Sequence, residues 1–234
     1  MNKERNPKSN TASGGIAIFC RKNLYGNVIP INRDNGNVLW VKLKKDYLGL
    51  EKEIFLGTVY HKPSGNKKEI IQLYDTLSED VAYFCIKGNV LLQGDFNAHT
   101  NSFPDFIESD QIIDDAFSEE NLLSQRNSED TCKVNKRGSE LLEFCKTQDF
   151  SILNGRKTGD LFGKITSFQW NGKGVVDYVI SLHDLYPCVT YLKVGSYSPW
   201  LSDHCPLFFK LTSHYNKNTE VKDNLSPLPD RFFS

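Results

Sequence analysis

Residues 89–99 read NVLLQGDFNAH, and the interpretation of the whole chain starts from this stretch. The apolar run 90–92 leads directly into Gly94, which predicts a buried strand that delivers polar side chains at its end. Asp95 and Asn97 are two residues apart, so on an extended chain they point the same way. One side chain could take a proton from water while the other orients a phosphate oxygen or the same water. The alternative is an Asp-x-Asn turn that only ends a strand.

The composition is that of a globular domain without a strong overall charge. The chain has 234 residues, of which 39% are hydrophobic, and a formal net charge of -1 at pH 7. A chain of this length can bury a sizeable core within one domain. Because there is no global basic excess, any contact with nucleic-acid phosphates has to come from a local patch.

The cysteines and the length of the apolar stretches indicate the cellular compartment in which the protein is expected. Six cysteines occur without a CxxC pair, and several lie in apolar runs where a thiol behaves as a small hydrophobic group. We therefore expect a reducing compartment and no zinc site. His99 has no second histidine at ligand spacing and is interpreted as a loop residue. The first residues lack the apolar core of a signal peptide, and no window approaches a span of about 20 apolar residues. The sequence thus predicts a soluble intracellular protein that is not secreted.

Hydrophobic patterning predicts a layered α+β arrangement. From Ile70 to Phe84, apolar residues recur at three- and four-residue spacing, which indicates an amphipathic helix lying on a sheet. A second helix is expected at about 139–147. Antiparallel pairing is expected among the first three strands. The strands are expected at 14–20, 38–44, 53–60, 89–93, 151–153, 189–194 and 205–211.

Three further segments have a distinct composition. Residues 105–130 contain nine acidic residues and one basic residue, so they are expected to form a solvated loop facing away from any nucleic acid. Asn171-Gly172 is a strong hairpin signal, and it lies between TSFQW and VVDYVI. The ends of the chain, 1–12 and 213–234, are polar and are interpreted as a tail and a linker around a domain at 13–212.

Motifs spread along the chain resemble a known superfamily. GDFN at 94–97, VDYV at 176–179 and SDH at 202–204 occur in the order found in the endonuclease/exonuclease/phosphatase superfamily, which includes apurinic endonucleases and deoxyribonuclease I. SGGIAIF at 13–19 and TSFQWNGKGVVDYVI at 166–180 are more narrowly similar to the endonuclease domain of non-LTR (LINE-type) retrotransposons. The run KRGSELLEFCKTQDFSILNGR at 136–156 supports the same branch. The resemblance covers about 13–211, and the combination of motifs is more specific than any one of them.

The resemblance implies a four-layer sandwich, in which two mixed β-sheets are flanked by helices, and a shared edge where the site residues meet. It implies a nuclease, a hydrolase that cleaves phosphodiesters with activated water and a Mg²⁺ or Mn²⁺ ion. Asp95 is then the general base, and Asn97 orients it or holds a phosphate oxygen. His204 stabilises the phosphoryl oxygens as imidazolium while Asp177 fixes its tautomer. Tyr60 matches a tyrosine that contacts the phosphate.

The remaining candidate residues hold the metal or the substrate. Asp203 is the candidate Mg²⁺ ligand. Thr166 and Ser202 match small hydroxyl positions beside the family's site. Arg156 lies inside the resemblance and is a candidate phosphate contact. The hairpin residues Trp170 and Lys173 are candidates for probing the DNA groove, and the alternative for Trp170 is that it folds back onto the sandwich.

One departure from the family concerns the metal. Its members carry two N-terminal strands ahead of the SGG strand, the first ending in Asn and the second in a Glu that supplies the principal metal ligand. Here only twelve residues precede Ser13, and Glu4 is the sole acid among them. The metal role is not carried over to Glu4. The sequence is therefore expected to be a domain that lacks its first strands.

Three functions remain open from the sequence. The first is a Mg²⁺-dependent endonuclease that nicks DNA and acts in the nucleus, with no protein partner or membrane implied. The second is a phosphoesterase of the same superfamily acting on another phosphodiester, such as a lipid or inositol phosphate headgroup. The third is a catalytically inactive remnant that keeps only the fold.

Overall fold

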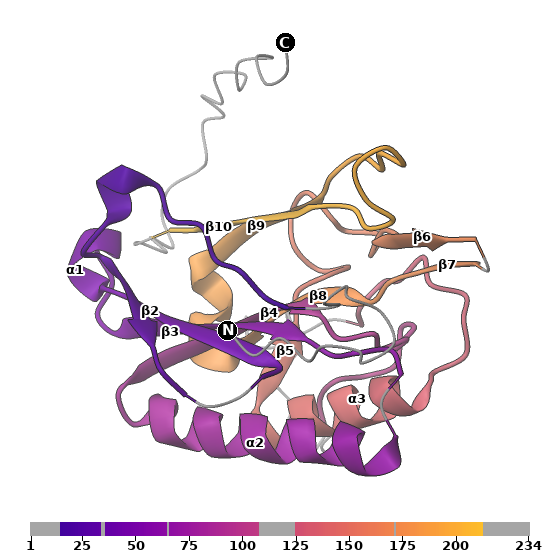
Figure 1. Cartoon of the computed structure of the whole chain (residues 1–234), viewed down its shortest axis with the longest axis horizontal. Helices are drawn as coiled ribbons and strands as arrows, with labels where there is room; N and C mark the ends of the chain where they lie inside the picture. The colour runs from indigo at the N-terminus through magenta and orange to yellow at the C-terminus, as the bar shows by residue number, and fades with distance from the viewer. Residues whose placement is uncertain (1–14, 34–35, 65, 108–124, 171, 213–234) are drawn as a thin grey trace, which may run out of the picture.

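The computed structural model describes residues 15–33, 36–64, 66–107, 125–170 and 172–212, and the structural statements below concern these residues. They form an α+β fold built on one large mixed sheet, as the patterning predicts (Figure 1). The expected tail at 1–12 and linker at 213–234 lie outside the described residues, so the domain boundaries stay a prediction.

The large sheet has six strands in the order β1-β2-β3-β4-β8-β5. β1, β2 and β3 pair antiparallel, β3 and β4 pair parallel, and β8 is antiparallel to both β4 and β5. The parallel pair β3 and β4 is joined by a helical crossover, as parallel neighbours require. The strands are β1 (Val28–Ile31), β2 (Val38–Leu43), β3 (Glu53–Tyr60), β4 (Gly88–Asp95), β5 (Phe150–Ile152) and β8 (Asp177–Leu182).

Two helices, α2 (Lys67–Cys85) and α3 (Lys136–Gln148), lie side by side against one face of this sheet (Figure 1). Asn66 begins α2 with a capping box, in which its side chain accepts from the Glu69 amide and Glu69 accepts from the Asn66 amide. The apolar positions predicted for this helix are all buried, among them Leu77 and Phe84 at no more than 1% exposure. Both predicted helices are therefore confirmed, and α3 is longer than expected.

A second, two-stranded sheet covers the opposite face of the large sheet. β9 (Val189–Val194) and β10 (Leu207–Leu211) pair antiparallel, and the short helix η3 (His183–Cys188) leads into them. A separate apolar cluster fills this side, with Leu91 and Val179 of the large sheet packed against Leu185 and Leu192. The described layers are thus helices, large sheet and small sheet (Figure 1). Two short helices lie among the first strands: η1 (Lys22–Leu24) precedes β1, and α1 (Lys45–Leu48) connects β2 to β3.

The predicted hairpin is present, but its return strand differs from the one expected. β6 (Ser167–Gln169) pairs with β7 (Gly172–Gly174), so the hairpin ends before VVDYVI. From Asp177 the chain enters the large sheet as β8, because Val179 and Ile180 are needed in the two cores on either side of that sheet. The hairpin therefore extends from the sheet edge beside the end of β4 (Figure 1).

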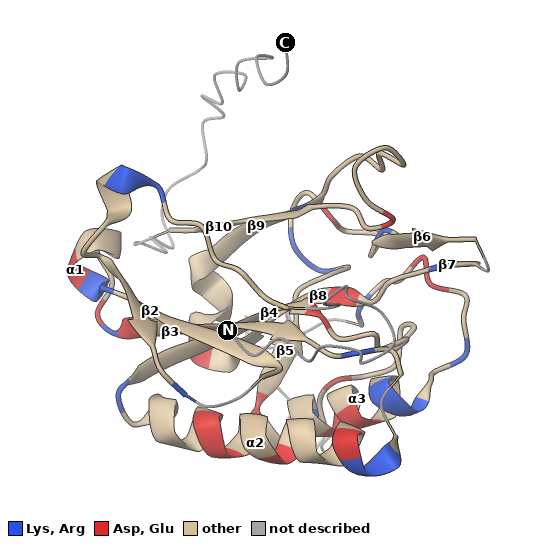
Figure 2. Cartoon of the chain, in the orientation of Figure 1, with Lys and Arg blue, Asp and Glu red and all other residues tan. Residues whose placement is uncertain are grey.

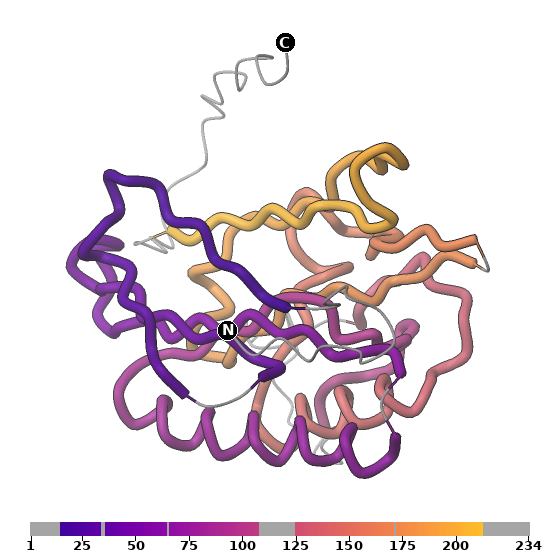
Figure 3. Tube along the Cα trace, viewed as in Figure 1, coloured from indigo at the N-terminus to yellow at the C-terminus, as the bar shows by residue number. Residues whose placement is uncertain are grey.

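The strand expected at 14–20 is wrong for the described part of that segment. Residues 15–21 form neither helix nor strand, and Phe19 is 95% exposed. A strand needs a neighbour for its backbone groups, and no described strand pairs with this segment. Figure 3 follows it as the indigo tube that leads into η1. The first strand of the large sheet is instead β1, which the sequence patterning did not single out.

The solvated loop expected at 105–130 is wrong at both of its described ends, and 108–124 lie outside the described residues. Asp105, Arg126 and Asp130 are each 2% exposed. Asp105 forms a two-pronged ion pair with Arg156, at 2.6 and 2.7 Å, and Arg126 donates to Thr100. Acidic composition misled the prediction because these carboxylates are buried with partners rather than hydrated.

Candidate active site

Three of the predicted residues meet at one edge of the large sheet because the strand register aligns them. Tyr60 ends β3, Asp95 ends β4, and Asp177 begins β8. Tyr60 is the register partner of Asp95, and Asp95 is the register partner of Asp177. β4 is flanked on both sides, so its end places Asp95 between the other two residues.

Glycine and asparagine shape the end of β4. Gly94 has φ 132°, and a Cβ there would lie 2.1 Å from the Val59 carbonyl oxygen, so only glycine allows this close approach to β3. Asn97 has φ 48°, in the left-handed region that asparagine tolerates. This turn folds Asn97 back onto Asp95. The backbone of the motif therefore does form a turn that ends the strand, as the alternative interpretation predicted. The same turn places Asn97 next to Asp95.

Asn97 holds the Asp95 carboxylate through both of its donors. Its backbone N–H donates to Oδ1 and its side-chain amide donates to Oδ2, each at 2.9 Å. The amide also donates to the His61 carbonyl at 2.8 Å, which fixes its orientation. Burial and the neighbouring Asp177 carboxylate raise the pKa of Asp95 to about 6, against the lowering effect of these hydrogen bonds. Asp95 is thus a carboxylate that titrates near neutral pH, as a general base requires.

His204 reaches the same edge from the segment that precedes β10. The backbone N–H of Cys205 donates to Thr166 at 2.7 Å and that of Phe168 donates to Asp203 at 2.7 Å, which ties the SDH motif to β6. His204 Nδ1 then lies 2.8 Å from Asp177 Oδ2. This hydrogen bond and the nearby carboxylates raise the pKa of His204 to about 9, although burial opposes the shift. The imidazole is accordingly protonated at neutral pH.

The two hydroxyl candidates support the backbone of the site. Thr166 Oγ1 accepts from the N–H groups of Val176 and Asp177, at 3.0 and 3.1 Å, and so fixes the start of β8. Ser202 Oγ accepts from the His204 N–H at 3.0 Å. Both hydroxyls therefore position Asp177 and His204.

Asp203 and Tyr60 flank these residues. The Asp203 side chain is exposed, and its charge is among those that raise the pKa of His204. Tyr60 is half-buried at its strand end. Of the predicted catalytic and metal residues, the structure thus places Asp95 with Asn97 and Asp177 with His204 as two neighbouring hydrogen-bonded pairs, with Asp203 and Tyr60 at the border.

The predicted substrate-binding residues divide into two groups. Arg156 does not lie at the surface, since its side chain is 2% exposed in the ion pair with Asp105. That pair fixes β5, because Asp105 also accepts from the Ile152 N–H at 2.7 Å.

Trp170 is 99% exposed, which is opposite to the alternative that it folds back onto the sandwich. Trp170 and Lys173 line an open groove of about 480 Å³ at the hairpin, together with Phe168 and Tyr197.

The donor set at the strand ends fits a hard divalent cation. Asp95, Asp177 and His204 have ligand atoms within 4.8 Å of one another, and two of the three are carboxylates. Each carboxylate charge disfavours the other, which a cation between them would relieve. Mg²⁺ prefers oxygen ligands and retains several waters, so one or two carboxylates suffice. The residues present therefore fit such an ion, with Asp203 next to them on the surface.

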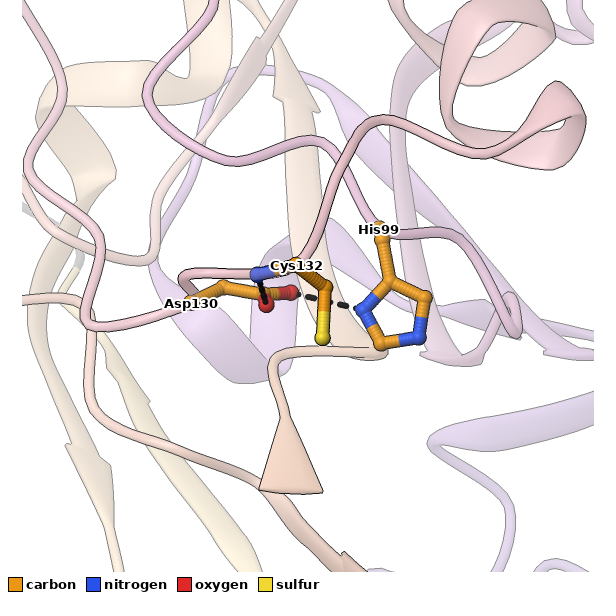
Figure 4. A group of neighbouring side chains, drawn as sticks. All are labelled: His99, Asp130 and Cys132. Atoms are coloured by element: carbon orange, nitrogen blue, oxygen red, sulfur yellow. Dashed lines mark hydrogen bonds and ion pairs between the residues drawn. The ribbon is translucent and has the colours of Figure 1, made fainter. Parts of the chain in front are cut away.

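Sequence reasoning missed a second group of side chains near this edge. His99, Asp130 and Cys132 lie together (Figure 4), and His99 packs against β7 of the hairpin. His61, next in the chain to Tyr60, was also not singled out. It is 4% exposed, and neither ring nitrogen has a hydrogen-bond partner among the described residues. Burial together with the Arg137 charge lowers the pKa of His61 to about 4. No spacing signal in the sequence links His99 to residues more than thirty positions away.

A family model described as endonuclease-reverse transcriptase matches residues 54–208, which is more than half of the chain. The chain belongs to the endonuclease-reverse transcriptase family. The match begins in β3 and ends in β10, so it contains every residue of the site built above. The superfamily predicted from the GDFN, VDYV and SDH motifs is thereby confirmed, and with it a fold of the nuclease and phosphodiesterase type.

Solved structures place this family member in the same fold. The endonuclease domain of TRAS1, a telomere-specific non-LTR retrotransposon, matches with a TM-score of 0.53 and 16% identity, covering 80% of this chain and 69% of that one. AP endonuclease LMAP from Leishmania major matches with a TM-score of 0.50 and 14% identity, covering 77% and 56%. No curated protein sequence matches. None of the described helices is long and apolar enough to cross a membrane.

Proposed function

We propose that the protein is a Mg²⁺-dependent phosphodiester hydrolase that nicks DNA, as an endonuclease of the retrotransposon type. The observation that supports this most directly is that two hydrogen-bonded pairs lie next to each other at one sheet edge, with the ligand atoms of Asp95, Asp177 and His204 within 4.8 Å of one another. Asp95 with Asn97 forms a carboxylate that titrates near neutral pH, and Asp177 with His204 forms a charged imidazole. Water activation and charge neutralisation are the two tasks of phosphodiester hydrolysis.

Asp95 is proposed to take the proton of the attacking water. The carboxylate is held from one side by Asn97, whose two donors occupy one lone pair on each oxygen. A lone pair remains on each oxygen for the water. With its pKa raised to about 6, Asp95 is ionised at neutral pH yet more basic than an ordinary aspartate.

His204 is proposed to face the phosphoryl oxygens as a cation. Nδ1 is directed at Asp177, so Nε2 is left to donate to a substrate oxygen. A charged donor of this kind stabilises the negative charge that develops in the transition state. Tyr60, at the end of the adjoining strand, is proposed as a further phosphate contact.

Asp203, with the neighbouring carboxylate of Asp177, is proposed to hold Mg²⁺, which leaves Asp95 free to act as the base. A bound divalent ion supplies Lewis-acid polarisation and neutralises phosphate charge. Divalent metals are a general feature of nucleases in this superfamily. The chain's own residues orient water, hold the proton at Asp95 Oδ1 or Oδ2, and donate from His204.

DNA is proposed as the substrate on two grounds. Two of the structural relatives described above are endonucleases, one from a non-LTR retrotransposon and one an AP endonuclease. The hairpin beside the site presents an exposed Trp170 and the cation Lys173. Figure 2 shows basic residues on β7 and at the starts of α2 and α3, and acidic residues further along α2. We propose that these local basic residues contact DNA phosphates although the chain as a whole has no excess of basic residues. A protein that nicks DNA would act in the nucleus, and we propose that location.

The test compares substrates under matched conditions. Supercoiled plasmid, an inositol phosphodiester and bis-(p-nitrophenyl) phosphate are each incubated with the full chain in Mg²⁺, and again with excess EDTA. We expect nicked circles from plasmid, loss of nicking with EDTA, and slow or no turnover of the inositol phosphodiester. Faster hydrolysis of the inositol compound than of DNA would support the second function, and no turnover of any substrate would support the inactive remnant.

A further inference from the structure

His99, Asp130 and Cys132 form a compact cluster that the proposed function does not use. His99 follows β4, whereas Asp130 and Cys132 precede α3, and the three side chains point toward one another (Figure 4). Their ligand atoms, a ring nitrogen, a carboxylate oxygen and a sulfur, all lie within 4.8 Å of one another. These atoms are three of the ligand types from which proteins build zinc sites.

Asp130 is fixed in place by backbone groups. Its Oδ1 accepts from the Cys132 N–H at 2.9 Å, and its Oδ2 accepts from the Val175 N–H at 3.1 Å. Its side chain is fully buried, and His99 Nδ1 lies 2.8 Å from Oδ2. A carboxylate oriented by neighbouring hydrogen bonds is the arrangement that metal sites require of their ligands. One lone pair on Oδ1 still has no hydrogen-bond donor among the described residues.

His99 and Cys132 are held next to Asp130 by the hairpin. A Cβ on Gly174 would lie 2.4 Å from His99 Cε1, so the imidazole packs directly against β7. Cys132 Sγ lies 3.7 Å from the Lys173 carbonyl oxygen, which accepts its weak hydrogen bond. The two side chains also line a cavity of about 160 Å³ shared with Asn97, Ser167 and Gln169. This cavity leaves space for a water as a fourth ligand.

We propose that His99, Asp130 and Cys132 bind a borderline-soft divalent ion, Zn²⁺ being the expected one, at a site separate from the Asp95–Asp177–His204 edge. In a tetrahedral site with bonds of about 2.0–2.3 Å the ligand atoms lie roughly 3.3–3.8 Å apart, so each side chain moves by about 1 Å or less from its present place. Sulfur and nitrogen ligands favour Zn²⁺ over Mg²⁺. The sequence predicts no zinc site because it contains no CxxC pair. The proximity of His99 to Cys132 arises only in the folded chain, so the sequence pattern could not show it.

Binding changes protonation in a defined way. The Cys132 thiol gives up its proton to solvent and its sulfur bonds to the ion instead of hydrogen-bonding to Lys173. His99 gives up its Nδ1 proton to solvent and carries its one ring proton on Nε2, so its hydrogen bond to Asp130 Oδ2 breaks and the Nδ1 lone pair faces the ion. The ion then joins the segment after β4, the loop before α3 and the hairpin strand β7. Since Asn97 lies two residues from His99, the site braces the backbone that carries Asp95.

Titration of the reduced, metal-free full chain with Co²⁺ tests the proposal. Co²⁺ bound by a thiolate gives a sulfur-to-metal charge-transfer band, which Mg²⁺-type oxygen sites do not give. We expect the band to saturate at one equivalent, to be absent from Cys132→Ser, and to persist in Cys20→Ser and Cys85→Ser, whose cysteines are exposed elsewhere. His99→Ala should weaken Co²⁺ binding at least about tenfold.

Two further variants separate this site from the active site. Asp95→Asn and His204→Ala should keep the band, because their side chains belong to the other cluster. Circular dichroism of each variant checks that it is folded, and Cys132→Ser is the least disruptive change. The proposal is overturned if the wild-type chain shows no band at saturating Co²⁺, if the band survives in Cys132→Ser, or if it is lost in Asp95→Asn.

Discussion

At the scale of single residues, Asp95 is ionised and His204 is protonated at neutral pH, because both pKa values are raised from different ordinary values. Asp95 has to be ionised to accept a proton, and its pKa is raised to about 6. His204 has to be protonated to donate, and its pKa is raised to about 9. We therefore expect kcat/KM for nicking to rise through pH 6, stay level, and fall through pH 9.

Asp177 contributes to both limits of this profile. Its charge raises the pKa of Asp95 and that of His204, so Asp177→Asn should move both limbs toward lower pH. The measurement is the pH–rate profile of the two proteins, with Asp75→Ala, an exposed change on the far face of α2, as control. If the rising and falling parts of the pH–rate profile stay at the same pH in Asp177→Asn, then Asp95 and His204 are not the groups whose titration sets the rate.

The sequence identified these residues because their motifs are local. GDFN, VDYV and SDH each fall within four positions, and the strand register then brings them together. His99, Asp130 and Cys132 carry no such local motif. Arg156 was proposed as a phosphate contact because it lies inside the family resemblance, and its partner Asp105, 51 positions away, could not be read from the local sequence. Side-chain pairs that form only through tertiary contacts cannot be predicted from the spacing of residues along the chain.

At the scale of elements, the end of β4 depends on Gly94. Gly94→Ala places a Cβ against the Val59 carbonyl and imposes a strained φ of 132°. We expect a loss of at least about 1–3 kcal/mol in the free energy of unfolding, measured by urea denaturation. Gly36→Ala is the control, since its Cβ would meet nothing within 4 Å, and should change stability by less than about 0.5 kcal/mol. Equal stability of the two variants would contradict this account of the strand end.

The hairpin β6–β7 gives a prediction about DNA contact. Lys173→Ala should weaken binding to all sequences alike and lower the salt slope by about one unit, because one phosphate contact is lost. Trp170→Ala should instead change which positions are cut, through groove shape and base-step deformability. Binding is titrated against salt and cuts are mapped on one long duplex, with Lys45→Ala on α1 as control. An unchanged slope together with an unchanged pattern would limit the hairpin to a structural role.

Elements with strong periodicity were predicted well, and an element that needs a distant partner was not. α2, α3 and β4 follow from the apolar spacing within each segment. The segment 15–21 is equally apolar by sequence, yet Phe19 is exposed and no described strand pairs with it. Apolar composition thus predicts a strand only where the fold also supplies a neighbour.

At the scale of the whole molecule, the strand-end carboxylates should link metal binding to stability. An ion that binds only the folded chain raises its stability by about 2.7 kcal/mol at a hundred times Kd. We expect Mg²⁺ to raise the melting temperature of the wild-type chain, and to raise that of Asp177→Asn much less. Thermal unfolding with and without Mg²⁺ measures this. An equal shift in both proteins would place the ion elsewhere.

The most direct test of the proposed function is the nicking rate of Asp95→Ala on supercoiled plasmid in Mg²⁺, compared with wild type and Asp75→Ala under the same conditions. Removing a general base typically costs about 10² to 10⁴ in rate. We predict a loss of that size in Asp95→Ala and a wild-type rate in Asp75→Ala. A folded Asp95→Ala protein that nicks at the wild-type rate would contradict the assignment of the site.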